Sequence, residues 1–179
     1  CPKCNACVPI RIPVDRFQPR RSQRRIAKRN ADLSYSVRAG EFDESHFQLY
    51  KRYQQARHGD GEMARHQPLD YQGFLLSEWC DTLLVEMRLA DELIGVAVVD
   101  QMHEGLSAVY TFFDPNHAAR SPGVQAILWA IDEVRRRRLK WLYLGYWIGE
   151  CDKMAYKQEY LPQERLREGQ WLEWNGFAR

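Results

Sequence analysis

The sequence lacks any apolar run long enough to cross a membrane as a helix. One of its longest runs, Leu93 to Val99, falls far short of the roughly 20 residues that a span requires. Internal repeats and low-complexity segments are also missing. At 179 residues the chain has the length of one domain and can bury a substantial core. We therefore expect a globular domain outside the membrane.

Cysteine is scarce and unevenly placed. Cys1, Cys4 and Cys7 follow each other at three-residue spacing, while Cys80 and Cys151 stand alone. An odd number with this spacing does not match a secreted disulfide framework, so we expect a reduced, cytoplasmic protein. Three thiolates can converge on one zinc ion or iron–sulfur cluster, although a closed zinc site has four ligands. Two alternatives stay open: a metal site completed from upstream or by Cys151, or reduced thiols without metal.

Acidic residues are almost missing from the stretch between Arg11 and Arg29, which holds eight cationic residues and only Asp15 as an anion. The segment from 20 to 31 is typical of a basic helix that is too polar to bury a wide face. Arginine binds phosphate oxygens in pairs of hydrogen bonds, so we expect this helix to contact a nucleic acid. The alternative is a solvated helix face. The candidate contact residues are Arg20, Arg21, Arg24 and Arg25.

An initiator methionine is also missing, because the chain begins at Cys1. We therefore expect residues 1–19 to be a cysteine-rich segment that remains from a truncated N-terminal domain. Residues 20–179 are expected to form the catalytic domain.

The pattern along the chain predicts a mixed α/β (α+β) fold. Asp43 is a typical N-cap for a helix that runs to Arg57, and Ser121 with Pro122 indicates the start of another helix. That second helix lies between two strands, which predicts a parallel pair with a right-handed crossover. Further helices are expected at 68–79, 151–157 and 162–167. Strands are expected at 10–17 (at a sheet edge, because of Pro13), 33–38, 82–89, 93–101, 106–113 and 141–148, with an apolar segment at 171–174.

This order of elements resembles the GCN5-related N-acetyltransferase fold. In that fold, backbone amides at the start of the crossover helix bind a pyrophosphate. The corresponding loop here, Arg120 to Gln125, has the arginine and one glycine but lacks the second small residue, and Pro122 removes one donor. The resemblance therefore implies the fold and disfavours an acetyl-CoA site.

Longer motifs resemble the arginyl-tRNA–protein transferase family over nearly the whole chain. They are C-x-x-C-x-x-C-V-P-I-R-I at Cys1 to Ile12, R-S-Q-R-R at Arg21 to Arg25, E-F-x-x-x-x-F-x-L-Y-x-R-Y at Glu41 to Tyr53, LSAVYTFFDP from Leu106, RS-P-G from Arg120, YLGYWI from Tyr143 and C-x-K-M-x-Y-K from Cys151. Two features depart from the family: Pro122 replaces the usual leucine, and a segment with an additional cysteine is missing.

The resemblance is to the bacterial aspartate/glutamate leucyltransferase branch. It implies transfer of leucine from leucyl-tRNA to an N-terminal Asp or Glu, which marks the acceptor protein for degradation in the N-degron pathway. Zinc or an iron–sulfur cluster is described at the family's N-terminal cysteines. Arginyl transfer is the first alternative, and a basic RNA-binding module without catalysis is the second.

Such a transfer needs little from the enzyme beyond orientation, an oxyanion donor and a proton for the leaving oxygen. An α-amine with a pKa of about 7.7–8.0 is partly neutral at pH 7, so no strong base is needed. We expect direct transfer without an acyl-enzyme and without a required cofactor. Asp114 is the candidate to hold the amine and Tyr110 the candidate hydroxyl donor, with Tyr156 or Lys157 at the oxyanion.

An acceptor with an acidic side chain also needs a cation in the site. A buried cation would reject Asn or Gln, because its charge would stay unpaired. The candidates are Arg57, His58, Arg120 and Lys153. Whether leucine or arginine is the donor depends on an apolar or acidic pocket that the sequence does not locate.

Overall fold

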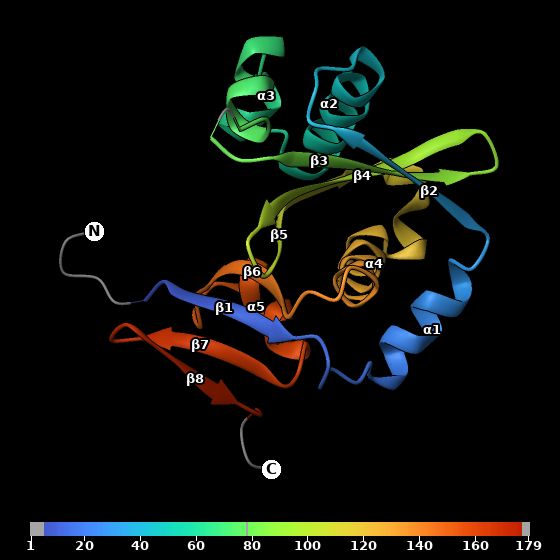
Figure 1. The fold of residues 1–179 in the computed structure, drawn as a ribbon. Coiled ribbons are helices and arrows are strands. Elements are labelled where there is room, and N and C mark those ends of the chain that lie inside the picture. Colours follow the sequence, from blue (N-terminus) through green and yellow to red (C-terminus); the bar gives the residue numbers. More distant parts are fainter. Residues whose placement is uncertain (1–5, 78, 177–179) are drawn as a thin grey trace.

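The computed structural model describes residues 6–77 and 79–176, which form one eight-stranded mixed sheet flanked by helices (Figure 1). The strand order is β2-β3-β4-β5-β6-β1-β7-β8. The strands are β1 (Val8–Pro13), β2 (Leu33–Ala39), β3 (Thr82–Leu89), β4 (Glu92–Met102), β5 (Gly105–Phe113), β6 (Trp141–Trp147), β7 (Gln163–Arg167) and β8 (Gln170–Trp174). The α-helices are α1 (Arg21–Arg29), α2 (Glu44–His58), α3 (Pro68–Leu75), α4 (Pro122–Arg136) and α5 (Asp152–Ala155), and the 3-10 helices are η1 (Glu62–Arg65), η2 (Pro115–Arg120) and η3 (Tyr156–Glu159).

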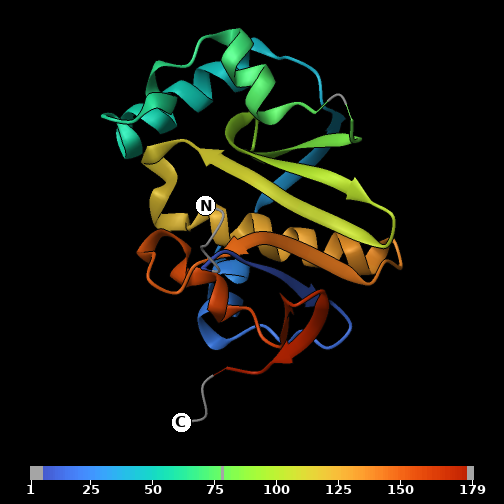
Figure 2. The same cartoon turned by 90° about the vertical axis from the view of Figure 1, so that its left-hand side faces the viewer.

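Two helical layers cover opposite faces of the sheet. Helices α2 and α3 lie on one face, and α4 with α1 beside it lies on the other (Figures 1 and 2). Aromatic residues such as Tyr50, Tyr71 and Phe112 form the core under α2 and α3. Aliphatic residues such as Ile131 and Val134 form the core under α4. No helix in the described ranges is long and apolar enough to span a membrane.

The antiparallel meander β3-β4-β5 and the parallel pair of β5 with β6 confirm the predicted order of elements. Asp43 caps α2 as expected: its carboxylate accepts the backbone N–H groups of Ser45 at 2.8 Å and His46 at 3.4 Å. Hydrogen bonds from Ser45 lower the pKa of Asp43 to about 2. Ser121 occupies the N-cap position of α4, but in a left-handed conformation (φ 57°) and without a capping hydrogen bond from its side chain.

Three expectations about secondary structure were wrong. Strand β1 is not at an edge: it pairs with β6 along its whole length and with β7 at Ile10 and Arg11, and Pro13 is tolerated because it is the last residue of the strand. The expected helix at 162–167 is strand β7, which forms a hairpin with β8. Helix α3 ends at Leu75 instead of Trp79.

The C-terminal hairpin depends on contacts that a local pattern does not reveal. Glu168 and Gly169 both have positive φ values, 50° and 77°, which is the turn geometry of a tight hairpin. The guanidinium of Arg11 lies between the rings of Trp141 (3.7 Å) and Trp171 (4.2 Å), so β1 holds the hairpin to the sheet. The boundary between residues 19 and 20 stays a prediction, and β1, which precedes it, is an interior strand of the sheet.

Candidate functional site

The candidate site lies where the parallel strands β5 and β6 separate and leave an opening between them. Strands β5 and β6 pair only from Gly105 to Ser107 with Trp141 to Tyr143, and then diverge. Strand β5 bulges there, because Val98 pairs with Tyr110 and Val99 with Ala108, which leaves Val109 as the extra residue. A bulge leaves backbone polar groups unpaired and is often found beside an active site. Beyond Ser107 the backbone of β5 no longer pairs with β6, so its polar groups on that side can bind a substrate.

Strand β6 is irregular at the same level. Ile10 of β1 pairs with Gly145 and Arg11 with Tyr143, so that β6 also carries an extra residue. Gly145 has a φ of 69°, a conformation that other residues rarely adopt. Both strands therefore bend as they separate, and this bending keeps the opening between them.

Tyr110, the predicted hydroxyl donor, lies on the face of β5 that α2 covers. The side-chain amide of Gln54 in α2 donates to its hydroxyl oxygen at 2.8 Å. Burial raises the pKa of Tyr110 above its ordinary value of 10, so the phenol stays protonated at neutral pH. Because Gln54 occupies an acceptor position, the proton of Tyr110 is free to be donated to a substrate oxygen.

Three of the predicted acceptor-binding residues, Arg57, His58 and Lys153, interact with one another near the end of α2. Arg57 and His58 end α2, and Lys153 comes from α5, almost 100 residues later in the chain. Burial lowers the pKa of His58, and the positive charges of Lys153 and Arg57 lower it further. The ring of Tyr53 packs edge-on against His58, with 6.2 Å between centroids. Arg57 and Lys153 thus supply positive charge suited to a carboxylate, and His58, whose lowered pKa leaves it neutral at pH 7, lies near both of them.

Lys157 and Tyr156 lie on the β6 side of the opening. The Nζ atom of Lys157 donates to the backbone oxygen of Tyr146 at 2.6 Å and lies 3.9 Å from the place that a Cβ atom at Gly145 would take. Burial lowers the pKa of Lys157, while Cys151 opposes this shift. Burial raises the pKa of Tyr156. Lys157 is therefore positioned at the strand separation, and Tyr156 precedes it in the chain.

Asp114 is buried at the end of β5, where its carboxylate already has two partners. One oxygen accepts the backbone N–H of Asn116 at 2.9 Å and so caps η2, and the other faces Arg52 at 3.4 Å. The contact with Arg52 is long for a hydrogen bond, which leaves this oxygen able to accept from a substrate.

Arg120 lies apart from the other candidates. Its guanidinium makes two parallel hydrogen bonds to Asp32, at 2.9 and 3.0 Å, and a third to the backbone oxygen of Arg29 at 3.1 Å. These contacts join η2 to the end of α1. The structure therefore places Arg120 in a structural contact rather than with Arg57, His58 and Lys153.

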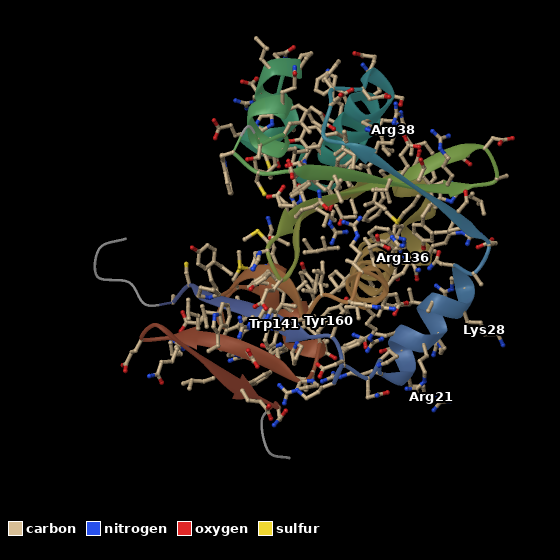
Figure 3. The ribbon with its side chains drawn as sticks, viewed as in Figure 1. Arg21, Lys28, Arg38, Arg136, Trp141 and Tyr160 are labelled. Carbon is tan, nitrogen blue, oxygen red and sulfur yellow. The ribbon has the colours of Figure 1, made fainter. Side chains whose placement is uncertain are left out.

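Helix α1 presents its cations to solvent, as its composition predicts. Arg20 pairs with Glu159, and Arg24 donates to the backbone oxygen of Pro19. Within the described ranges, Arg21 and Arg25 are exposed and take part in no ion pair. Figure 3 shows Arg21 and Lys28 pointing away from the body of the protein. This face can contact a polyanion without any rearrangement of the fold.

Of the three clustered cysteines, the described residues include only Cys7. Cys1 and Cys4 lie outside the described residues, and Cys7 is exposed with a free thiol. In ranges 6–77 and 79–176, no group of three or more His, Cys, Asp or Glu side chains is arranged to hold a metal ion. A metal at the N-terminal cysteines stays a prediction.

Sequence reasoning missed Tyr53, Gln54 and Arg52, which contact the predicted residues from α2. Gln54 follows Tyr50 by one helical turn and precedes His58 by another, so helical spacing places it on the same face as both. This helical spacing was the available signal. Glutamine is neither titratable nor nucleophilic, so the sequence alone does not single it out as a site residue.

Comparisons with known proteins show the family and the fold of the chain. A family model described as "Arginine-tRNA-protein transferase, C terminus" matches residues 45–167. An aspartate/glutamate leucyltransferase of Alcanivorax borkumensis is 49% identical over 173 residues, which is 97% of this chain and 72% of that protein. The C-terminal domain of a putative lysylphosphatidylglycerol synthetase from Agrobacterium fabrum has a TM-score of 0.60 at 11% identity, covering 86% of this chain and 50% of that one.

A GCN5-related glucosamine N-acetyltransferase region of a fungal multi-domain β-N-acetylglucosaminidase has a TM-score of 0.55 at 12% identity, over 92% of this chain and 20% of that one. At these low identities the two structures bear on the fold alone. They support the fold class that the order of elements predicts, a mixed sheet with a crossover helix.

Proposed function

The chain belongs to the arginine-tRNA-protein transferase family, and from this membership we propose that it moves leucine from leucyl-tRNA to the N-terminal Asp or Glu of an acceptor protein. The observation that carries the proposal is the position of Tyr110, which Gln54 and Tyr53 of α2 contact where β5 and β6 separate, with Tyr53 also packing against His58 at the end of the same helix. The product is a protein marked for degradation, and the reaction belongs in the cytoplasm, where charged tRNA is found.

The reaction is a direct exchange of an ester for an amide. The neutral α-amine attacks the ester carbonyl carbon, a C–N bond forms, and the bond to the ribose oxygen breaks. The amine loses one proton and the released ribose hydroxyl gains one, so no other reactant is needed. Because the amine is partly neutral at pH 7, the enzyme acts mainly by orientation and by stabilising the oxyanion.

Each group around the opening has a role in this scheme. Tyr110 donates to the departing ribose oxygen, since its own acceptor position is filled by Gln54. The oxygen of Asp114 that faces Arg52 holds the acceptor amine. Lys157, and Tyr156 beside it, stabilise the oxyanion from the β6 side. The backbone of β5 beyond Ser107, which no longer pairs with β6, supplies a further donor.

The cations at the end of α2 select the acceptor. A carboxylate next to Arg57 and Lys153 pairs with positive charge and can accept a hydrogen bond from neutral His58, whereas an N-terminal Asn or Gln leaves the charge uncompensated. Arg120 is a weaker candidate for this role, because Asp32 already binds its guanidinium. Arg20, Arg21, Arg24 and Arg25 contact tRNA phosphates along α1.

The same geometry accommodates the two alternatives. An arginyl donor would use the same transfer chemistry, and an RNA-binding module would use α1 alone. A zinc ion or iron–sulfur cluster at Cys1, Cys4 and Cys7 takes no part in the proposed steps.

A transfer assay tests the proposal. The protein is incubated with labelled leucyl-tRNA or arginyl-tRNA and with otherwise identical peptides that begin with Asp, Glu or Asn. We expect label from leucyl-tRNA on the Asp and Glu peptides and not on the Asn peptide. Label from arginyl-tRNA alone would establish the first alternative, and tRNA binding without any transfer would establish the second.

A further inference from the structure

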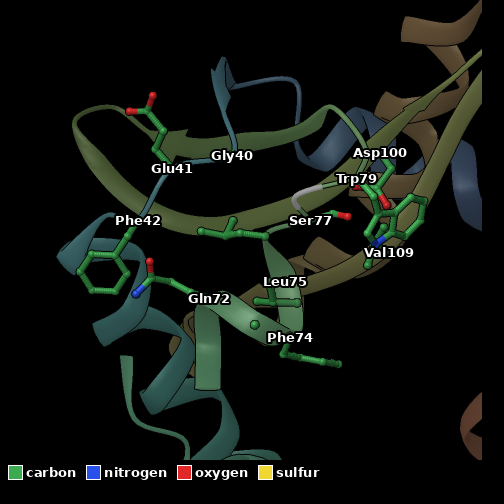
Figure 4. Close-up of a pocket in the computed structure, with 12 residues that line it drawn as sticks. Gly40, Glu41, Phe42, Gln72, Phe74, Leu75, Ser77, Trp79, Asp100 and Val109 are labelled. Atoms are coloured by element: carbon green, nitrogen blue, oxygen red, sulfur yellow. The ribbon is translucent and has the colours of Figure 1, made fainter. Parts of the chain in front are cut away.

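A hollow of about 620 Å³ lies beside the candidate site, on the face of the sheet that α2 and α3 cover (Figure 4). Its walls come from the segment before α2, from the end of α3 and from β4 and β5. Its volume falls in the range of about 300–1,000 Å³ that is usual for small-molecule sites. None of the candidate residues from the sequence lines it.

Much of its wall is apolar and exposed. Phe74 and Leu76 line it from α3 and the residue after that helix, and Trp79 and Val109 line it as well. Trp79 is 83% exposed and Phe74 is 44% exposed, which is unusual for large aromatic side chains. Exposed apolar residues that line a hollow are typical of a binding site.

The hollow also contains a buried carboxylate. Asp100 of β4 is 9% exposed, and one of its oxygens accepts the hydroxyl proton of Thr82 at 2.6 Å. Within the described ranges, no cationic side chain forms an ion pair with it. A buried carboxylate without a cation is expensive unless a ligand supplies the positive charge. Figure 4 places Asp100 next to Trp79 and Val109.

Two contacts connect the hollow to the transfer site. Val109 is the extra residue of the bulge at which β5 and β6 separate, and it also lines the hollow. The ring of Phe74 packs edge-on against the ring of Tyr110, with 5.4 Å between centroids. A group held in the hollow would therefore be next to the proposed proton donor.

We propose that this hollow binds the leucyl group of the donor, with its side chain against Phe74, Leu76 and Val109 and its α-ammonium facing Asp100. The inference rests on the proposed function, since it takes leucyl-tRNA as the donor. A leucyl ester combines an apolar side chain with a cationic amine. These two groups match the apolar residues and the carboxylate that line the hollow. The acceptor fits poorly, because its acidic side chain would face Asp100 and Glu41.

Binding of L-leucinamide, followed by calorimetry or NMR, tests the hollow without the reaction. We expect it to bind more tightly than 4-methylpentanamide, which lacks the ammonium group. Asp100→Asn keeps an oxygen for Thr82 and removes only the charge, so it should weaken binding about tenfold or more. Glu173→Gln, a matched change on an exposed strand, should leave binding unchanged. Equal affinity of the wild type and Asp100→Asn would overturn the inference.

Transfer kinetics separate the hollow from the acceptor site. Asp100→Asn should raise the KM for leucyl-tRNA about tenfold and leave the KM for an Asp-starting peptide unchanged. A rise in the peptide KM alone would assign the hollow to the acceptor. In the binding experiment, tighter binding of L-argininamide than of L-leucinamide would assign it to an arginyl donor. Either result would overturn the inference. Phe74→Ala, which removes an exposed ring, gives a second test if Asp100→Asn does not fold.

The two proposals can fail separately. If the wild type moves no leucine but binds L-leucinamide through Asp100, the proposed function is wrong while the ligand class of the hollow is supported. If leucine is transferred and the Asp100→Asn variant is fully active, the function is correct and the hollow is overturned.

Discussion

Replacing Tyr110 with phenylalanine removes one hydroxyl group and should have two separable effects. The hydroxyl is the partner of the Gln54 amide, which is buried in α2 and donates to it at 2.8 Å. A buried donor that loses its partner costs about 1–3 kcal/mol of stability. For a chain of this size, each kcal/mol lowers the melting temperature by about 2–4 °C.

The second effect is on catalysis. If Tyr110 donates to the leaving oxygen or to the oxyanion, its loss should lower kcat about 10²- to 10³-fold, as for other single donors in such sites. The KM values for leucyl-tRNA and for the acceptor peptide should change little, because the hydrogen bond strengthens only in the transition state. Single-turnover transfer of labelled leucine measures this directly.

The chain provides a matched control in Tyr35. The side-chain amide of Gln125 in α4 donates to the hydroxyl of Tyr35 at 2.7 Å, in the same kind of pair on the opposite face of the sheet. Tyr35→Phe should lose a similar amount of stability and keep its activity. If Tyr110→Phe keeps a kcat within about threefold of that of Tyr35→Phe, Tyr110 only holds Gln54 in place, and its catalytic role is refuted.

Three further predictions concern charge. Lys153→Gln should lower kcat/KM for an Asp-starting peptide roughly threefold to tenfold and leave that for an Asn-starting peptide unchanged, which steady-state assays compare. Arg21→Glu with Arg25→Glu should weaken tRNA binding and reduce the slope of log affinity against log salt by about 1 per arginine, whereas Arg167→Glu in the C-terminal hairpin should not. Burial raises the pKa of Glu86, but hydrogen bonds from Arg88, His46 and Arg38 together outweigh it and lower this pKa to about 2. The charge of Glu86 therefore stabilises the fold above its unfolded pKa, and this stability is lost as the pH falls toward 2. Urea unfolding of Glu86→Gln at pH 7 should show a loss of about 2–3 kcal/mol and a weaker decline between pH 5 and pH 3, and identical pH profiles for the two proteins would contradict this.

Features set by local chemistry could be predicted from the sequence. Asp43 and Pro122 indicate helix starts because capping and proline geometry involve only neighbouring residues. The central strands could be predicted because their apolar runs are long. The helix expected at 162–167 failed because the polar segment Gln163–Arg167 is a strand only through its pairing with β1 and β8.

Some residues of the candidate site could also be predicted from the sequence, and others could not. Arg57, His58 and Lys153 could be named from their motifs, and the fold brings them together. The position of Arg120 could not be predicted, because it depends on Asp32, which is 88 positions away in the sequence. Asp100 could not be recognised as a ligand-binding residue either. Its carboxylate lines a hollow only because α3 and β5 pack around it, and these elements are distant in sequence.

The interior position of β1 has a consequence for how the protein is made. Val8–Pro13 leaves the ribosome well before its partners, which are β6, beginning at Trp141, and β7, beginning at Gln163. At about 5–20 residues per second, β1 waits roughly 6–30 s for these strands to be synthesised. Its apolar residues are exposed throughout that time, so nascent chains arrested before Trp141 should be good chaperone clients. Release should follow only when the C-terminal hairpin closes against β1.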